Sequence, residues 1–461
     1  MAASARPHDT GHSSSTSVAV IGAGLAGTLL SILLARRGHQ VRLYERLPDL
    51  RRENIPAGRS INLALAERGI AALEAAEVMQ QVLPLLIPMR GRLLHAPDEA
   101  LTFVPYGQRE HEVIHSVSRP GLNRILLDAA ESAGVRIHFR HSALDADLQR
   151  SYLLMRDEAA GTTYELPLER VIAADGAGSP IRRALAAQTD VTCTEDLLEH
   201  DYKELSLPPD DYGNHRIHKN ALHIWPRGGF MLIALPNLDG SFTLTLFLPR
   251  KGPESFASLR DAAAVQQFFN HHFPDAATLL PNLAEEFFAH PVGVMGTVRC
   301  GSWAIEDRLL LIGDAAHAMT PFHGQGMNCA FEDCRELDTL LGQHADWRTA
   351  FAMFERSRLP NTNAIADMAL ENYQEMRDTV RHPKFQLQKN LSLELERQFP
   401  ERFLPRYSMV MFHDEIPYSV AYERGRIQTA ILDELTRHVA SIDQVDYRLA
   451  TRLIEENLPP I

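Results

Sequence analysis

The chain has 461 residues, of which 45% are hydrophobic and 23% charged, and it carries a net charge of −13. These values are typical of a globular protein with about one to three domains, and the acidic balance excludes a nucleic-acid binder that needs a basic face. No stretch approaches the roughly 20 apolar residues of a membrane span, so we expect a soluble protein without a membrane partner.

The chain start and the cysteines indicate the compartment. Residues 1–16 are rich in Ser, Ala, Gly and Thr and lack an apolar core, which predicts a disordered leader rather than a signal peptide. The four cysteines, Cys193, Cys300, Cys329 and Cys334, form no CxxC pair. A chain of this length does not need disulfides for stability, so we expect four reduced thiols and a cytoplasmic protein.

The first elements after the leader follow a βαβ pattern. Residues 18–21 form a continuous apolar run that is typical of a buried parallel strand. A glycine-rich turn follows at 22–27, a helix is expected at 28–37 that ends at Gly38, and the next strand is expected at 41–45. This order indicates the start of a parallel α/β sheet.

The glycine-rich turn has the spacing of a dinucleotide-binding turn. Gly22, Gly24 and Gly27 would allow the tight turn, the close approach of a pyrophosphate, and the packing of helix on strand. The helix that follows offers free N–H groups and a positive dipole end to the anion. Glu45 ends the next strand, where an acid accepts hydrogen bonds from ribose hydroxyls. Together these features favour a dinucleotide site over a structural turn.

The middle of the chain continues the α/β pattern. Residues 119–134 predict a helix and residues 135–139 a short strand. Residues 142–157 and 164–168 predict a meander that leads to a strand at 171–174. We assign these elements to the cofactor-binding domain.

The second half begins with a change of pattern. Between residues 220 and 249, strand-like runs broken by Gly and Pro predict a separate, largely antiparallel sheet. Residues 261–290 are expected to be helical, residues 309–312 to form a last strand of the cofactor domain, and a helix to start near Gly326. Residues 348–461 are expected to be mostly helical. We expect breaks in that region at Pro360, Pro383, Pro400, Pro405 and Pro417.

Two further segments belong with the glycine-rich turn. Asp175 and Gly176 follow one buried strand, and Gly313 and Asp314 end another that leads into a helix. Each pair alone is a common turn. An aspartate at such a place can accept a hydrogen bond from a ribitol or ribose hydroxyl of a flavin cofactor, while the start of the following helix faces the flavin ring. The three segments in this order and at this spacing narrow the cofactor to FAD.

These segments resemble the FAD-dependent aromatic hydroxylases, which are single-component flavoprotein monooxygenases. The resemblance implies an α/β fold in which a Rossmann-like FAD-binding domain joins an antiparallel-sheet substrate domain and a C-terminal helical layer. It also implies that Arg119 reaches the flavin. A flavin-facing loop is implied at Pro321, Phe322, His323, Gly324 and Gln325, followed by cofactor-binding positions at Gly326, Met327 and Asn328.

The expected domains are discontinuous in sequence. The FAD-binding domain is expected at 17–65, 110–190 and 295–345, the substrate domain at 66–109 and 191–294, and the C-terminal helical region at 346–461. In this arrangement the helical region covers the substrate pocket.

Five more segments resemble the kynurenine-hydroxylating members of this family, and bacterial members most closely. They are residues 58–65, 89–92, 105–107, 369–376 and 405–409, and the resemblance extends from about residue 18 to residue 458. It implies NADPH- and O2-dependent hydroxylation of L-kynurenine to 3-hydroxykynurenine through a flavin hydroperoxide. FAD is expected to be tightly bound. There is no second GxGxxG motif, so NADPH should bind only transiently, and its preference over NADH stays open.

The substrate residues follow from the resemblance and from the chemistry of the substrate. A carboxylate buried unpaired in an apolar cavity is costly, so the cavity needs an arginine and hydroxyl donors. By resemblance, the polar end consists of Arg92, Tyr106, Asn372 and Tyr407, and the apolar end of Leu222, Met231, Ile233, Leu235, Phe247 and Met376. Because an aniline is electron-rich as the neutral amine, we expect no dedicated general base.

Other interpretations fit parts of the pattern. His317 and His323 could act as acid–base groups, or His323 could only pack in its loop; no group of His, Cys and Asp has the spacing of metal ligands, so we expect no metal. A different aromatic hydroxylase, a reductase or halogenase relative, or a non-catalytic carrier on the same fold are the alternative classes. The complete set of FAD motifs argues against a carrier. The oligomeric state stays open, with a homodimer as one option.

Overall fold

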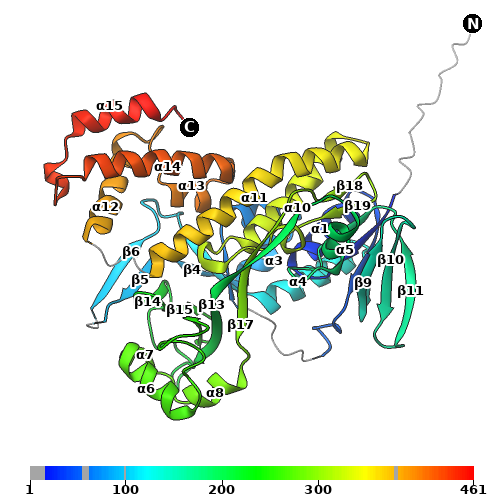
Figure 1. Ribbon diagram of the computed structural model, residues 1–461, viewed down its shortest axis with the longest axis horizontal. Helices are drawn as coiled ribbons and strands as arrows, with labels where there is room; N and C mark the ends of the chain where they lie inside the picture. Colours follow the sequence, from blue (N-terminus) through cyan, green and yellow to red (C-terminus); the bar gives the residue numbers. More distant parts are fainter. Residues whose placement is uncertain (1–15, 54–61, 98–99, 378–382) are drawn as a thin grey trace, which may run out of the picture.

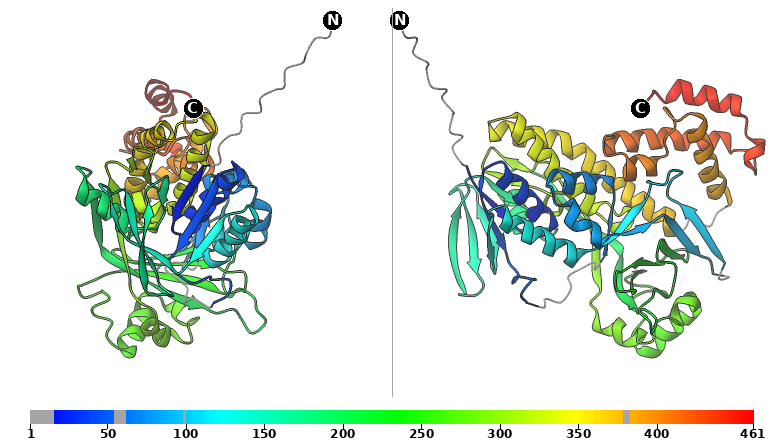
Figure 2. Two further views of the ribbon diagram at one scale, coloured as in Figure 1. Left: turned by 90° about the vertical axis from the view of Figure 1, so that its right-hand side faces the viewer. Right: turned by 180° about the vertical axis from the view of Figure 1, so that it is seen from behind.

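The computed structural model describes residues 16–53, 62–97, 100–377 and 383–461 (Figure 1). The leader expected at residues 1–16 lies, except for Thr16, outside the described residues, as do residues 58–61 of the segment 58–65. The described residues form four β-sheets and, toward the C-terminus, a layer of helices (Figures 1 and 2).

The largely parallel sheet contains the strands that we assign from the sequence to the cofactor domain. Its strand order is β18-β19-β12-β1-β2-β8, and only the edge pair β18–β19 is antiparallel. The strands are β1 (Ser17–Ile21), β2 (Gln40–Glu45), β8 (Arg136–Phe139), β12 (Val171–Ala173), β18 (Ala304–Ile305) and β19 (Leu309–Leu311). The associated helices are α1 (Leu25–Arg36), α4 (Arg119–Ser132), α5 (Pro180–Gln188), α9 (Asp314–His317) and α10 (Gly326–Gln343).

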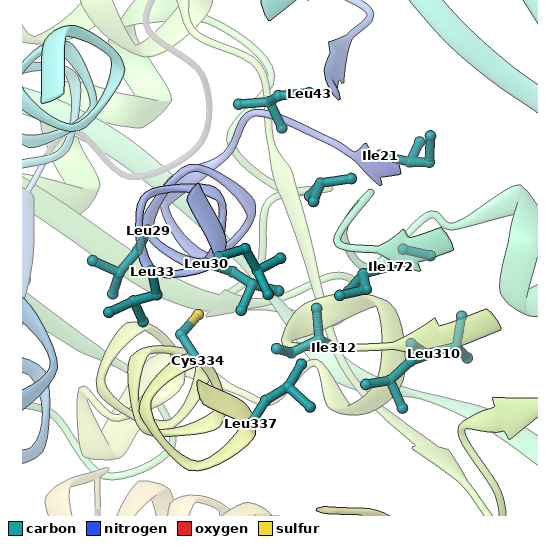
Figure 3. Close-up of a cluster of buried hydrophobic side chains, with 14 of the residues drawn as sticks. Ile21, Leu29, Leu30, Leu33, Leu43, Ile172, Leu310, Ile312, Cys334 and Leu337 are labelled. Carbon is teal, nitrogen blue, oxygen red and sulfur yellow. The ribbon is translucent and has the colours of Figure 1, made fainter. Parts of the chain in front are cut away.

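The core of this region lies between the sheet and helices α1 and α10 (Figure 3). The central strands are apolar at successive positions because both of their faces are covered. Figure 3 shows the side chains that meet there: Ile21, Leu29, Leu30, Leu33, Leu43, Ile172, Leu310, Ile312, Cys334 and Leu337. The expected helix at 28–37 begins earlier, at Leu25, directly after the glycine-rich turn.

Two small sheets flank this region. The expected meander is antiparallel, with the order β11-β10-β9, and consists of β9 (His141–Asp147), β10 (Tyr152–Asp157) and β11 (Thr162–Pro167). The second small sheet has the order β3-β7-β4 and consists of β3 (Asn62–Leu65), β4 (Ile87–Met89) and β7 (Ile114–Ser118). Between its strands lie α2 (Glu67–Ala75), α3 (Met79–Val82) and the 3-10 turn η1 (Leu83–Leu85).

The second large sheet confirms the separate, largely antiparallel sheet and extends it to seven strands. Its order is β17-β13-β16-β15-β14-β5-β6, and only β14 and β5 pair in parallel. The strands are β5 (Gly91–His95), β6 (Leu101–Pro105), β13 (Cys193–Leu207), β14 (Leu222–Pro226), β15 (Met231–Pro236), β16 (Phe242–Pro249) and β17 (Gly293–Cys300). Its outer face is covered by α6 (Ala262–His272), α7 (Pro274–Ala277) and α8 (Leu283–Ala289). The helical stretch 261–290 is thus divided, and Pro274 opens its second piece.

The C-terminal helices are α11 (Trp347–Arg377), α12 (Pro383–Gln398), α13 (Arg406–Phe412), α14 (Tyr418–Leu435) and α15 (Tyr447–Asn457), with a 3-10 turn η4 (Ile442–Gln444). The expected break at Pro360 is wrong, because Pro360 lies inside α11. Proline removes one helical N–H and strains the preceding turn. Side chains around it bond the helix carbonyls: Asn361 Nδ2 donates to Ser357 O (2.8 Å) and Thr362 Oγ1 to Leu359 O (3.2 Å).

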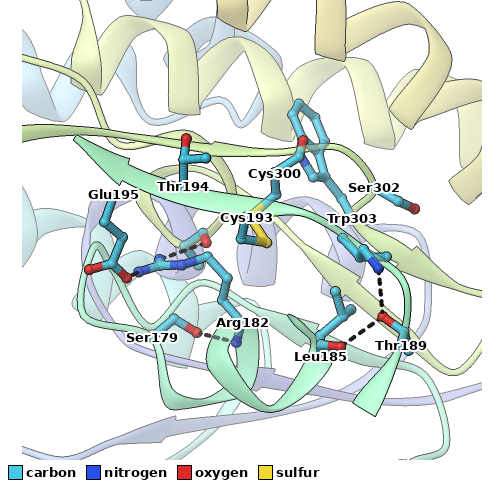
Figure 4. Close-up of a disulfide and its surroundings, with 12 residues drawn as sticks. Ser179, Arg182, Leu185, Thr189, Cys193, Thr194, Glu195, Cys300, Ser302 and Trp303 are labelled. Carbon is cyan, nitrogen blue, oxygen red and sulfur yellow. Dashed lines mark hydrogen bonds and ion pairs between the residues drawn. A yellow bond between two sulfur atoms is a disulfide. The ribbon is translucent and has the colours of Figure 1, made fainter. Parts of the chain in front are cut away.

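The expectation of four reduced thiols is also wrong for one pair. Cys193 and Cys300 form a disulfide, with Cα atoms 4.1 Å apart (Figure 4). They lie directly opposite each other on the antiparallel strands β13 and β17, a pairing that their separation of 107 residues conceals. Cys329 and Cys334 are free, and burial raises the pKa of both thiols well above the usual value. In the described part of the chain, no helix is both long and apolar enough to cross a membrane.

Candidate active site

The glycine-rich turn connects β1 to α1 and has one open position. Gly22 has φ +102°, and a Cβ there would lie 2.4 Å from the carbonyl oxygen of Ala174. A Cβ on Gly27 would lie 2.0 Å from the carbonyl oxygen of Gly22. A Cβ on Gly24 would have no atom of the described residues within 4 Å. The turn is therefore closed by its own backbone on one side and open at Gly24, which fits the approach of a pyrophosphate.

Glu45 lies against this turn at the end of β2. Its Oε2 accepts a hydrogen bond from the N–H of Ala23 (2.8 Å) and its Oε1 from the N–H of Leu47 (2.9 Å). A carboxylate oxygen can accept more than one hydrogen bond, so both oxygens keep capacity for ribose hydroxyls. Glu45 thus braces the glycine-rich turn as well as facing the place where a dinucleotide would bind.

Asp175 leaves a buried acceptor at the second motif. Its Oδ2 accepts from Ser179 Oγ (2.8 Å), whereas its Oδ1 is buried without a hydrogen-bond partner among the described residues. Burial raises the pKa of Asp175 to about 6, although the hydrogen bond from Ser179 opposes this. A buried, unpaired acceptor fits a hydroxyl donor of FAD. The following Gly176 has φ +86°, as its turn requires.

Arg182 joins the second motif to the third, and sequence reasoning missed it. Its guanidinium is buried and donates to Ala177 O (2.5 Å), to Ala315 O (3.0 Å) and to Glu195 (Figure 4). The carbonyls belong to the turn after Asp175 and to helix α9. From the sequence alone, an arginine in the first turn of a helix is expected to face solvent, so the sequence carries only a weak signal for the buried role of Arg182.

The third motif leads from β19 into α9. Gly313 has φ +59° and donates its N–H to Asp333 Oδ2 (3.2 Å), while Asp314 is exposed at the first position of α9. Gly326 and Met327 open α10. Arg119 is the first residue of α4. These positions are compatible with cofactor binding; whether each contacts FAD stays a prediction.

Asn328 is used by the protein itself. Its Nδ2 donates to Ala64 O and to Gly324 O (both 2.9 Å), and its Oδ1 accepts from the N–H of Ala66 (2.9 Å). The side chain thereby fixes the flavin-facing loop to strand β3. Its role as a direct cofactor ligand stays a prediction, and any contact with FAD would be in addition to these bonds.

The flavin-facing loop is a 3-10 turn, η2 (Pro321–His323), that ends at Gly324 in the left-handed conformation with φ +68°. Phe322 is buried and stacks on Tyr373, with ring centroids 3.9 Å apart. Asn372 Nδ2 donates to Phe322 O (2.6 Å), so this predicted substrate residue binds the loop. The Gln325 side chain is fully buried and turns toward helices α13 and α14.

The structure brings together three of the four residues predicted for the polar end. Arg92 of β5 lies over the Tyr407 ring of α13 (4.8 Å) and the Tyr106 ring (5.9 Å), and the two tyrosine rings stack at 5.5 Å. Arg92 Nε is buried without a partner among the described residues, and Nη1 is 3.7 Å from Glu375 Oε1. A buried guanidinium with an unused N–H fits an incoming carboxylate.

Burial and charge decide the protonation states at this end. Burial opposes the charge of Arg92, but the phenol oxygens of Tyr407 and Tyr106 and the carboxylate of Glu375 favour the cation, so the pKa of Arg92 is raised above its usual value. Burial raises the pKa of Tyr106 and of Tyr407, so both phenols keep the O–H that a carboxylate can accept from. Lys389 of α12 lies nearby, and burial and Arg92 lower its pKa.

The residues predicted for the apolar end line one face of the seven-stranded sheet and the end of α11. One buried cluster contains Met231, Phe247 and Met376 together with Phe322 and Tyr373, and the partly buried Leu222 and Ile233 pack against it. Leu235 instead packs with the neighbouring cluster around Tyr106 and Tyr407. The apolar side chains therefore lie between the flavin-facing loop and the Arg92 end.

The cavity at the Arg92 end is small. Its volume is about 20 Å³, and its lining includes Glu375, Phe385, Gln386 and Lys389, which sequence reasoning missed. This is room for about one water molecule, so a substrate requires these side chains to move apart. The four residues belong to α11 and α12 and lack any sequence pattern that would distinguish them from ordinary helix positions.

His323 and His317 have different surroundings. His323 stacks on Tyr407 (5.4 Å), and burial lowers the pKa of His323 to about 3, so its ring is neutral at physiological pH. His317 Nε2 bonds Asp333 Oδ2 (2.6 Å), and the Cys329 sulfur lies within 4.8 Å of possible ligand atoms of both residues. Arg358 donates to Asp333 (2.7 Å) and Glu332 (2.6 Å). A guanidinium in that position opposes a metal cation, so this group is a buried ion-pair network.

Comparisons with known proteins agree with this geometry. The family described as FAD binding domain matches residues 15–350. A tetrameric 2-methyl-3-hydroxypyridine-5-carboxylic acid oxygenase shares the fold, with a TM-score of 0.66 and 20% identity over 80% of this chain and 95% of that one. PqsL from P. aeruginosa in complex with 2-aminobenzoylacetate gives a TM-score of 0.63 and 20% identity over 79% of this chain and 97% of that one. The family match and the shared fold define a protein with an FAD-binding domain.

Sequence relatives narrow the family. A protein of Myxococcus xanthus named kynurenine 3-monooxygenase is 48% identical over 444 residues, 96% of each chain. A protein of the same name from Stenotrophomonas maltophilia is 46% identical over 445 residues, 96% of this chain and 98% of that one. The chain belongs to the kynurenine 3-monooxygenase family within the FAD-binding monooxygenases.

Proposed function

We propose that this chain hydroxylates L-kynurenine to 3-hydroxykynurenine with NADPH and O2 as cosubstrates and FAD as the bound cofactor. The observation that carries this proposal is 48% identity to a kynurenine 3-monooxygenase over 96% of the chain. The arrangement of Arg92, Tyr106 and Tyr407 beside an apolar wall supports it, because kynurenine combines a carboxylate with an aniline ring.

The residues that we assign to FAD binding surround the open side of the glycine-rich turn and the start of α1. We assign the pyrophosphate to the turn at Gly24 and the start of α1, and hydroxyl groups to Glu45 and Asp175. The chemistry that FAD supplies when bound is the activation of O2 with electrons from the nicotinamide cosubstrate. The chain itself binds, orients and shields the reacting groups.

The substrate carboxylate is paired with Arg92 and accepts hydrogen bonds from the phenols of Tyr106 and Tyr407. Glu375, 3.7 Å from Arg92, is placed to attract the substrate α-ammonium group. The aniline ring lies along Leu222, Met231, Ile233 and Phe247, with Phe322 at its flavin end. Asn372 holds Phe322 by donating a hydrogen bond to the Phe322 carbonyl oxygen, and Met376 completes the apolar wall of the pocket.

No pocket residue is assigned as a general base. His323 is neutral because burial lowers its pKa to about 3, and it stacks on Tyr407. A neutral aniline does not need deprotonation before its ring carbon reacts, so the role left for the pocket is positioning and exclusion of water.

Location and assembly remain predictions. We propose a cytoplasmic location, which cell fractionation tests, and a homodimer, which size-exclusion chromatography tests. The Cys193–Cys300 disulfide opposes the cytoplasmic prediction, because disulfides are rare in the reducing cytoplasm.

The activity is tested with the purified, FAD-loaded protein. NADPH oxidation under air is followed with and without L-kynurenine, and the product is identified by mass spectrometry. We expect strong stimulation by L-kynurenine and a product that is heavier by one oxygen atom. Stimulation without a hydroxylated product would make kynurenine an effector only, and a colourless protein that does not take up FAD would favour the carrier class.

A further inference from the structure

The flavin-facing loop is held from two sides by buried amide side chains. On one side, Asn328 bonds Ala64, Ala66 and Gly324. On the other side, Gln325 Oε1 accepts from the hydroxyl of Tyr418 (2.7 Å), and Gln325 Nε2 donates to Met411 Sδ (2.9 Å). The second anchor connects the loop to α13 and α14, which lie about a hundred residues further along the chain.

Tyr418 is held by Arg68 as well as by Gln325. It is fully buried at the first position of α14, and the guanidinium of Arg68 lies 3.9 Å from the centre of its ring. Arg68 is also fully buried and donates to His413 O (3.1 Å) and to Ile416 O, the segment that leads into α14. Burial raises the pKa of Tyr418 well above 10, so its hydroxyl remains a donor at any physiological pH.

The same helix reaches both the substrate pocket and the loop. Helix α13 carries Tyr407, which stacks with Tyr106 and His323, and Met411, which accepts from Gln325. Gln325 directly precedes α10, and its carbonyl accepts the first helical bond from the N–H of Cys329 (2.8 Å). A displacement of Gln325 therefore moves the loop between pocket and cofactor.

We propose that Tyr418 is a positioning residue that holds the flavin-facing loop through Gln325, so that the loop follows helix α13 and its pocket residue Tyr407. The inference rests on the proposed function. Leaving a buried amide oxygen without its hydrogen-bond donor costs stability, whereas replacing both partners of the hydrogen bond by apolar groups can be nearly neutral. Removing the Tyr418 hydroxyl therefore shifts the loop away from its native position while the ring, and its contact with Arg68, remain.

The test compares Tyr418→Phe with Tyr422→Phe in the FAD-loaded enzyme. Tyr422 lies one turn later on α14, is partly exposed, and donates at 3.4 Å to Glu371 rather than to the loop. Two quantities are measured: the change in the flavin absorption spectrum on adding L-kynurenine, and the hydroxylated product formed per NADPH consumed. Binding constants for FAD and kynurenine are measured alongside.

For Tyr418→Phe we expect both quantities to fall at least about threefold, while both binding constants stay within about threefold of the wild type. Tyr422→Phe should match the wild type. If Tyr418→Phe equals Tyr422→Phe in both quantities, the proposal is overturned. If the wild type fails to hydroxylate kynurenine, the proposed function falls, but the flavin absorption spectra of the FAD-loaded variants and wild type, compared without kynurenine, still test the position of the loop.

Gln325→Met keeps the proposal testable if Tyr418→Phe does not fold. This variant replaces the hydrogen-bond acceptor by an apolar side chain of similar length. It should also lower the change in the flavin spectrum and the product formed per NADPH consumed. The double variant should be no worse than the worse single variant, because the two residues act through one hydrogen bond. Effects that multiply in the double variant would show that Tyr418 does not act through Gln325.

Discussion

The turn at Gly22–Gly27 and the pocket around Arg92 are assembled in different ways. The turn is made by backbone that is contiguous in sequence, and Gly22 and Gly27 are required because a Cβ at these positions would make contacts of 2.4 and 2.0 Å with carbonyl oxygens. The pocket is made by side chains from β5, β14, β15, β16, α11, α12 and α13. Local backbone requirements are visible in a sequence, whereas convergence of side chains from distant elements is a property of the fold.

The largest expected effect breaks the pocket. Arg92→Ala should weaken L-kynurenine binding by about 3 kcal/mol or more, roughly a hundredfold in Kd, because the substrate carboxylate would lose its charge partner. Binding is measured through the flavin spectrum, and FAD should be retained. Arg90→Ala is the matched control, since Arg90 is exposed two residues earlier. Equal effects of the two substitutions would contradict the assignment.

The next effect separates two glycines of the turn. Gly22→Ala should destabilise the apoprotein by about 2–4 kcal/mol, because the new Cβ meets Ala174 O and φ is +102°. Gly24→Ala should leave the melting temperature of the apoprotein unchanged and weaken FAD binding about tenfold or more, since only the pyrophosphate would meet its methyl group. Calorimetry measures the stability and the melting temperature of the apoprotein, and titration with FAD measures the affinity for the cofactor. Retained FAD affinity in Gly24→Ala would place the pyrophosphate elsewhere.

The Asp175 carboxyl predicts a pH dependence of FAD binding. Its pKa is about 6 without the cofactor, and a hydroxyl donor from FAD would favour the charged form and lower that pKa. FAD affinity should therefore be constant above pH 6 and fall by up to about tenfold per pH unit below it. Quenching of FAD fluorescence on binding measures this. Asp175→Asn should remove the dependence; if the slope persists, another group causes it.

The smallest expected effect concerns His323. Its ring is neutral, so His323→Gln should lower kcat less than about tenfold, whereas loss of a general base costs about 10²–10⁴-fold. The pH profile of kcat/KM should keep its shape in the variant. A loss of turnover with unchanged kynurenine binding would identify His323 as a chemical participant and contradict the view that the pocket only positions its substrate.

The sequence was a good guide to elements and a poor one to long-range pairing. Apolar runs and glycines predicted β1, α1, β2 and the meander, because these depend on local periodicity. Helix α11 continues through Pro360, where the Asn361 side chain bonds a carbonyl of the preceding turn, and the Cys193–Cys300 pair depends on the register of β13 against β17. Neither has a local signal.

The same distinction holds within the candidate site. Arg92, Tyr106 and Tyr407 were found by resemblance to a family, and physical reasoning alone required only some arginine and some hydroxyl donors. Lys389 and Glu375 were missed because charged residues on a helix usually face water. Gln325 was assigned to the flavin-facing loop, but the direction of its side chain, toward Met411 and Tyr418, follows from the packing of α13 and α14 on that loop.

The most direct test of the account is a comparison of L-kynurenine with its decarboxylated analogue in the wild type and in Arg92→Ala. If Arg92 pairs with the carboxylate, the wild type should bind L-kynurenine about a hundredfold more tightly than the analogue. In Arg92→Ala this preference should fall to about tenfold or less, because only the hydrogen bonds from the Tyr106 and Tyr407 hydroxyls to the carboxylate would remain. A preference that survives the substitution undiminished would contradict the account, since a residue other than Arg92 would then be the charge partner of the carboxylate.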